Sequence, residues 1–153
     1  MISENWDRRF LSLAEHIAQW SKDPSTKVGA VLVNENRIVV GMGYNGFARG
    51  VVDSDDRLTN RDLKYKYVVH AEVNAILQAG ANARGAHLYV WPSFLIPCIC
   101  HECAKVAVQA GVKEVVGYHP DRERAERGAR WADSIAVAKA MLDEAGVGYR
   151  GTW

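Results

Sequence analysis

Apolar residues recur along the chain with two different spacings, and each spacing predicts a different secondary structure. Between residues 5 and 20 they stand alternately four and three positions apart, which predicts one amphipathic helix. The apolar stripe of this helix comprises Trp6, Phe10, Leu13, Ile17 and Trp20. The segment SKDPST, residues 21–26, ends it. Two β-branched runs then flank the polar turn 34–37, and together they predict a β-hairpin.

The second half of the chain alternates between helical and extended patterns. Three segments predict helices, each followed by a glycine that can end a helix: 70–79, 100–110 and about 132–145. Three apolar segments predict strands: 87–91, 112–118 and the tail 147–153. Alternating strands and helices predict an α/β fold in which helices cover the faces of a sheet.

Two polar segments lie outside these patterns. Residues 46–66 are irregular and contain glycine, so they predict mainly loop. The charged run DRERAERGAR, residues 121–130, predicts the solvated face of a helix rather than a site for a ligand.

Composition limits the classes of protein to consider. The chain has 153 residues, 48% of them hydrophobic and 24% charged, which predicts one soluble globular domain over residues 1–153. A net charge of +1 disfavours a large nucleic-acid surface. No segment approaches the roughly 20 apolar residues of a membrane helix, and the N-terminus lacks an apolar signal core. We therefore expect a cytoplasmic protein that does not enter membranes.

The three cysteines lie within six residues of one another, which suggests metal ligation rather than a disulfide. Cys100 and Cys103 fall on one face at the start of a predicted helix, where the thiolate form is favoured. Together with His70 they supply three zinc ligands and leave one position for water. We interpret Cys98 as a non-ligand, because His101 and not a cysteine stands three residues after it.

Glu72 follows His70 by two residues and is not needed as a ligand. Histidine, any residue and glutamate, followed later by a C-x-x-C pair, is the signature of zinc deaminases, in which the glutamate is the general acid and base. We therefore expect Glu72 to carry protons for a hydrolytic deamination. A purely structural zinc site remains the non-enzyme alternative, because Cys98 or His101 can supply a fourth ligand.

Longer motifs carry a family resemblance that extends over nearly the whole chain. STKVGAVLVN, GYNGFARG, KYKYVVHAEVNAI and CHECAKVAVQAGVKEV resemble the deoxycytidylate deaminases of the cytidine deaminase-like superfamily. HAEVNAI, with Asn74, and GYNG resemble the branch that acts on nucleoside monophosphates. The resemblance implies a three-layer α/β/α fold with a central mixed five-stranded sheet. It also implies a homo-oligomer, often a hexamer.

The resemblance implies roles for residues beyond the zinc set. It implies that Asn45 binds the sugar and that backbone groups around Ala71 contact the pyrimidine. Lys27 and Arg49 are candidate phosphate contacts by position and charge alone. Tyr118 stands near, though not in register with, an aromatic residue that often closes over the substrate in this family.

The same resemblance implies a second, regulatory site. In regulated members, the GYNG region contributes to an allosteric site for dCTP with Mg²⁺, and Tyr44, Asn45 and Gly46 match it. We expect the reaction of dCMP with water to give dUMP and ammonia, a step of pyrimidine nucleotide metabolism.

One departure from the family leaves the substrate open. The segment WPSFLIPCI before Cys100 is longer than usual, so a deaminase that uses dCTP remains an alternative. A tRNA adenosine deaminase shares the zinc set but needs a basic surface for RNA. A deaminase of riboflavin synthesis commonly carries a fused reductase domain, for which 153 residues leave no room.

Overall fold

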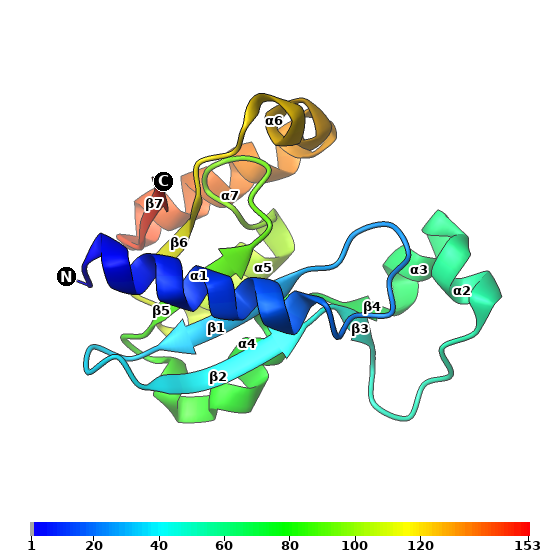
Figure 1. The fold of residues 1–153 in the computed structure, drawn as a ribbon, viewed down its shortest axis with the longest axis horizontal. Coiled ribbons are helices and arrows are strands. Elements are labelled where there is room, and N and C mark those ends of the chain that lie inside the picture. The colour runs from blue at the N-terminus through cyan, green and yellow to red at the C-terminus, as the bar shows by residue number, and fades with distance from the viewer. Residues whose placement is uncertain (1) are drawn as a thin grey trace.

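A mixed five-stranded sheet forms the centre of the fold in a computed structural model that describes residues 2–153 (Figure 1). The strands are β1 (Gly29–Val33), β2 (Val39–Tyr44), β5 (His87–Trp91), β6 (Glu114–Tyr118) and β7 (Gly148–Thr152). They lie in the order β2-β1-β5-β6-β7. β1 is antiparallel to β2 and β5, whereas β5, β6 and β7 are parallel to one another. A separate ribbon pairs β3 (Gly46–Phe47) with β4 (Val68–Val69).

Helices cover both faces of this sheet and make three layers. The helices are α1 (Glu4–Ala18), α2 (Asp55–Thr59), α3 (Arg61–Tyr67), α4 (Ala71–Ala79), α5 (His101–Ala110), α6 (Arg122–Gly128) and α7 (Ala132–Ala145), with short 3₁₀ turns η1 (Gly80–Ala83) and η2 (Ala129–Trp131). α1 crosses one face, and α4, α5 and α7 pack on the other. Within residues 2–153, no helix is long and apolar enough to cross a bilayer. The expected α/β/α architecture is confirmed.

The central strand β1 explains why both faces of the sheet are covered. All five of its residues are buried, because successive side chains point to opposite faces of a strand. Val31 and Val33 pack into the core beneath α1, whereas Ala30 and Leu32 pack into the core shared with α4 and α5. A strand with two apolar faces requires helices on both sides.

The predicted stripe of α1 is displaced around the helix. The buried face is centred on Asp7, Phe10, Leu11, Ala14, Ile17 and Ala18. Trp6 and Leu13 are only partly buried, and Trp20 lies beyond the end of the helix with 53% of its surface exposed. The helix packs small residues such as Ala14 and Ala18 against β1, because the sheet approaches closely there, as it does at Gly29. Aromatic spacing alone therefore misplaced the buried face.

The prediction of loop over residues 46–66 was wrong, because two short helices form there. Ser54 and Asn60 cap them by accepting hydrogen bonds from the backbone N–H groups of Arg57 and Leu63. These caps are local, and α2 buries none of its residues, so no apolar period marks it in the sequence. In Figure 1, α2 and α3 stand beside the sheet rather than on its faces.

Candidate metal centre and catalytic cavity

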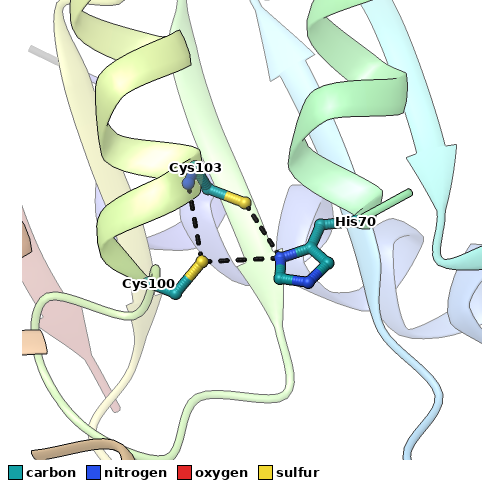
Figure 2. Close-up of side chains that lie close together, drawn as sticks. All are labelled: His70, Cys100 and Cys103. Atoms are coloured by element: carbon teal, nitrogen blue, oxygen red, sulfur yellow. Dashed lines mark hydrogen bonds between the residues drawn. The ribbon is translucent and has the colours of Figure 1, made fainter. Parts of the chain in front are cut away.

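Three residues that are distant in the sequence meet at the N-terminal ends of two helices (Figure 2). His70 is the N-cap of α4, and Cys100 is the N-cap of α5. The Nδ1 atom of His70 lies 3.4 Å from the Sγ of Cys100 and 3.2 Å from the Sγ of Cys103. All three candidate ligand atoms lie within 4.8 Å of one another. The fold therefore brings together the three residues that the sequence predicts to bind zinc.

These distances fit a zinc ion. Tetrahedral zinc with bonds of about 2.1 Å to nitrogen and 2.3 Å to sulfur places its ligand atoms about 3.6 Å apart. The donor set of one imidazole and two sulfurs is also one that zinc favours. These three residues would supply three zinc ligands, and His70 and Cys100 line a cavity from which water could reach the metal.

The pKa values of this cluster favour a thiolate on Cys100, which is the form that binds a metal cation. Hydrogen bonds from Cys103 and His70 lower the pKa of Cys100 to about 4. The hydrogen bond with Cys100 raises the pKa of His70 to about 9. The pKa of Cys103 is raised by its hydrogen bond to Cys100 and by burial. Because zinc binds deprotonated ligands, its binding would release the protons that His70 and Cys103 retain.

Cys98 and His101, the two candidates for a fourth ligand, do not belong to the cluster, although Cys98 lines the same cavity. Ser134 on α7 hydrogen bonds to His101 through both the backbone N–H and the ring Nδ1, at 3.1 and 2.7 Å. Burial raises the pKa of the Cys98 thiol to about 12, so this cysteine favours the neutral form. The three-ligand group found among residues 2–153 contains neither residue.

Glu72 lies in the first turn of α4 beside the metal cluster. It is only 6% exposed and lines the same cavity as His70 and Cys100. Burial raises the pKa of this carboxyl, which makes it easier to protonate. A carboxyl group of this kind next to a metal-ligating histidine is suited to accept and return a proton.

The cavity itself has a volume of about 200 Å³ and is built from segments far apart in the sequence. Its floor comes from the first turns of α4 and α5 and from Val90 at the end of β5. One wall comes from the segment 23–28 and from α3. The opposite wall comes from the long segment 92–99 and from residues 130–135. The carboxyl end of a sheet strand is a common place for a ligand site in α/β proteins.

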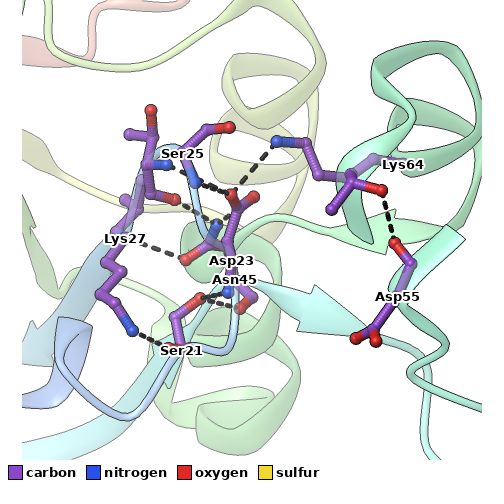
Figure 3. Close-up of polar contacts among 10 residues, drawn as sticks. Ser21, Asp23, Ser25, Lys27, Asn45, Asp55 and Lys64 are labelled. Carbon is purple, nitrogen blue, oxygen red and sulfur yellow. Dashed lines mark hydrogen bonds and ion pairs between the residues drawn. The ribbon is translucent and has the colours of Figure 1, made fainter. Parts of the chain in front are cut away.

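A buried polar cluster holds the first of these walls in place (Figure 3). Asp23 accepts hydrogen bonds from the backbone N–H groups of Ser25 and Thr26, at 2.8 and 3.2 Å, and pairs with Lys64 of α3. Asn45 joins the cluster through its amide, which donates to Thr26 O at 2.9 Å, and its Oδ1 accepts from the N–H of Val28 at 2.8 Å. This cluster fixes the loop between α1 and β1 against α3.

Three of the expected substrate contacts lie away from the cavity. The Lys27 ammonium donates a hydrogen bond to the backbone carbonyl of Ser21. Arg49 is exposed on the loop after β3, and the ring of Tyr118 packs into the core beneath α1. None of these three is among the described residues that line the cavity, whereas Asn45 and Ala71 do line it.

A smaller cavity of about 120 Å³ lies on the other side of the polar cluster. Tyr44, Asn45 and Gly46, the three residues of the GYNG region, line it together with Lys22 and Trp20. Asp23, Asn45 and Lys64 line both cavities. The two cavities therefore share one wall of buried, hydrogen-bonded side chains.

The residues of the cavity that were not anticipated from the sequence include Arg61, Arg130 and Trp131. Arg130 belongs to the charged run that predicted only a solvated face. Arg130 is exposed, as that prediction requires, but it also lines the cavity, because η2 turns the end of the run toward the segment 92–98. An aromatic residue directly after the run was the only signal in the sequence, and it does not specify a neighbour.

Comparison with known proteins shows which family this chain resembles. The profile of the family described as the cytidine and deoxycytidylate deaminase zinc-binding region matches residues 4–119. Deoxycytidylate deaminase of Mus musculus is 45% identical over 157 residues, which cover 95% of this chain and 78% of the relative. A deaminase of Aliivibrio fischeri, described as uncharacterized, is 41% identical over 149 residues, or 96% of this chain and 92% of the relative.

A solved structure with the same fold supports these matches. The dCMP deaminase of the cyanophage S-TIM5, in complex with dCMP and dUMP, superposes with a TM-score of 0.71. The two sequences are 27% identical, and the alignment covers 99% of this chain and 100% of the other. The matched region of the family profile contains His70, Glu72, Cys100 and Cys103.

Proposed function

Because this chain belongs to the family of zinc-binding cytidine and deoxycytidylate deaminases, we propose that it hydrolyses dCMP to dUMP and ammonia. The chain is a zinc-dependent hydrolytic deaminase, and the open question is its substrate. The observation that carries the proposal is the placement of the buried Glu72 beside the His70, Cys100 and Cys103 cluster on one cavity. Membership of an enzyme family disfavours the alternative of a zinc-stabilised binding module.

Each step of the reaction then has a residue that suits it. Bound by His70, Cys100 and Cys103, zinc supplies a Lewis acid that makes water a stronger acid and nucleophile. Glu72 accepts a proton from the attacking water and delivers it to ring nitrogen 3. The oxygen of that water bonds to carbon 4. Glu72 then carries the remaining proton of this oxygen to the amino group, so the bond between carbon 4 and the amino nitrogen breaks, ammonia leaves and a carbonyl remains at carbon 4. The buried position of Glu72 keeps its carboxyl available for both directions of transfer.

Binding of the nucleoside is assigned to two residues of the cavity. The backbone around Ala71, at the start of α4, contacts the pyrimidine edge in this proposal. Asn45 uses both amide hydrogens on Thr26 and Asp23, and one lone pair of Oδ1 on the N–H of Val28. An amide oxygen has a second lone pair. A hydroxyl of the sugar can donate to it without disturbing the cluster.

Ammonia release from the zinc-loaded protein tests the substrate. The panel comprises dCMP, dCTP, deoxycytidine, cytidine, cytosine and an adenosine-containing tRNA stem-loop. We expect dCMP to have the highest kcat/KM of the panel. Turnover of dCTP at a comparable rate would replace dCMP by the triphosphate alternative, and turnover of the RNA alone would assign the chain to the tRNA deaminases.

We further propose that the smaller cavity binds dCTP with Mg²⁺ as a regulator. It is lined by Tyr44, Asn45 and Gly46, and it contains the cation Lys22, which is paired with Asp53 at 2.9 Å. The shared wall of Asp23 and Lys64 gives a bound effector direct contact with the substrate cavity. Addition of dCTP and Mg²⁺ should lower the substrate concentration at half-maximal velocity with dCMP. An unchanged curve would contradict this regulation.

We propose that the protein is a homo-oligomer, with a hexamer implied by the family resemblance. The edge strand β2 and the helix α4 beside it expose apolar side chains that include Val39, Met42, Tyr44 and Leu77. An exposed apolar edge of this kind is suited to a second copy of the chain. Sedimentation velocity at micromolar concentration tests the proposal, and a monomer would contradict it. The need for reduced Cys100 and Cys103 supports a location in the cytoplasm.

A further inference from the structure

The rim of the catalytic cavity carries two arginines from separate parts of the chain. Arg61 begins α3 on one wall, and Arg130 lies in η2 on the opposite wall. Both residues are exposed and line the cavity. We propose that Arg130 and Arg61 bind the 5′-phosphate of the substrate and make the enzyme selective for nucleotides over nucleosides. This inference rests on the proposed function, because it requires a phosphorylated substrate.

Among the described charged side chains that line the cavity, Arg61 and Arg130 are the two cations without an anionic partner. Lys64 is neutralised by Asp23, which lies 3.1 Å away. Glu72 lies in the first turn of α4 and is only 6% exposed, whereas Arg61 and Arg130 are exposed. No carboxylate among residues 2–153 forms an ion pair with Arg61 or Arg130. A phosphate that binds either arginine would therefore not displace an existing carboxylate partner.

Arg130 is already held in an orientation that suits an anion. Its guanidinium carbon lies 4.1 Å from the centre of the Trp131 ring. Stacking on an indole face stabilises a guanidinium and leaves its N–H groups free to bind oxygen atoms in a forked arrangement. Trp131 is supported in turn by Phe94, whose ring centre lies 5.1 Å away. Both aromatic residues line the cavity beside Arg130.

The wall that carries Arg130 is tightly packed. A Cβ atom added to Gly128 would lie 2.8 Å from the carbonyl oxygen of Phe94, so the end of α6 rests directly on the segment 92–98. On the same wall, the guanidinium carbon of Arg127 lies 5.3 Å from the centre of the Phe94 ring. Arg127 does not line the cavity among the described residues. It is therefore a matched control for Arg130, with the same charge and a similar aromatic contact.

The test compares a nucleotide with its nucleoside in the zinc-loaded enzyme. We expect Arg130→Gln and Arg61→Gln each to lower kcat/KM for dCMP roughly 10- to 100-fold, the range for loss of a hydrogen bond to a charged group. For deoxycytidine, which has no phosphate, the change should be less than about twofold. Arg127→Gln should leave both substrates unaffected, and Arg130→Lys should fall between wild type and Arg130→Gln because it retains charge but not the fork.

A binding measurement separates this inference from the proposed function. Calorimetry with dUMP and with deoxyuridine should show that Arg130→Gln and Arg61→Gln weaken dUMP alone. If wild type binds dUMP in this way but does not deaminate dCMP, the proposed substrate is wrong while the phosphate site stands. Equal losses for dCMP and deoxycytidine, or no loss in either variant, would overturn the phosphate site, even if dCMP is the best substrate of the wild type.

Discussion

The ammonium group of Lys64 lies 3.1 Å from the Oδ1 of Asp23, and the two side chains are only 8% and 9% exposed. The same carboxylate accepts hydrogen bonds from the backbone of Ser25 and Thr26. This ion pair therefore links α3 to the loop that follows α1, and it stands between the two cavities.

Removal of the Lys64 charge should be costly. Lys64→Met leaves the carboxylate of Asp23 buried without its cation, and such changes lower the free energy of unfolding by about 3 kcal/mol or more. Urea denaturation of the zinc-loaded protein measures the change. Lys66→Met on the same helix is the control, because Lys66 is exposed. A loss below about 1 kcal/mol for Lys64→Met would contradict the interpretation of a buried, stabilising pair.

Metal content should distinguish the three cysteines. Purified protein should contain about one zinc per chain, and Cys100→Ala or Cys103→Ala should lose most of it because each removes one of three ligands. Cys98→Ala should retain zinc. Elemental analysis after gel filtration measures this directly and does not depend on activity. Loss of zinc from Cys98→Ala but not from Cys100→Ala would show that the ligand set is wrong.

Glu72 should separate catalysis from metal binding. Glu72→Ala should keep zinc and thermal stability but lose kcat by several orders of magnitude, because several proton transfers depend on one carboxyl. Glu102→Gln is a suitable control, since Glu102 also lies in the first turn of a helix but is exposed and paired with Lys105. Near-normal turnover by a zinc-loaded Glu72→Ala protein would remove Glu72 from the mechanism.

Gly43 allows β2 to approach the helix that carries the site. A Cβ at Gly43 would lie 2.6 Å from the carbonyl oxygen of Ala71 and 2.6 Å from the amide nitrogen of Ala75. Gly43→Ala should therefore displace the first turn of α4 and lower stability and kcat together, by about 1–3 kcal/mol in the free energy of unfolding. Gly46→Ala meets nothing within 4 Å and should be nearly neutral for stability. Equal melting temperatures for the two variants would contradict this packing.

Glu114 should contribute to stability in a pH-dependent way. Burial opposes ionisation of its carboxyl, but hydrogen bonds from His87 and Arg150 outweigh burial and lower the pKa below the usual 4.5. The unfolded chain therefore binds the proton more readily, so this contribution is present above about pH 4.5 and is lost as the pH falls. The free energy of unfolding should decline less steeply with acid in Glu114→Gln than in wild type. Parallel slopes would contradict the assignment.

The fold and the metal cluster could be predicted largely from local patterns. The hairpin, the strands 87–91 and 112–118, and the glycine-ended helices each follow from a period of the chain itself. His70, Cys100 and Cys103 lie at the starts of α4 and α5, and these two helices are in contact. The sequence does not predict α2 and α3, because these helices are held by caps and by the Lys64–Asp23 pair rather than by an apolar stripe.

The walls of the cavity could not be predicted because they depend on contacts between distant segments. Nothing near Arg130 in the sequence indicates that Gly128 packs on Phe94. In the same way, Lys27 carries a charge that suits a phosphate, but its ammonium is turned to the backbone of Ser21. Position along the chain identifies the cations and not the direction in which tertiary packing turns them.

The packing of the segment 92–98 against the end of α6 separates two tasks within one cavity. His70, Glu72 and Cys100 stand at helix starts that pack on the sheet, whereas the segment 92–98 and η2 contribute another part of the cavity lining. A library of variants confined to residues 92–97 and 130–131 should therefore yield enzymes that retain metal and proton transfer yet accept different groups at the far end of the nucleotide. Substrate preference should in this respect be able to change independently of the metal site.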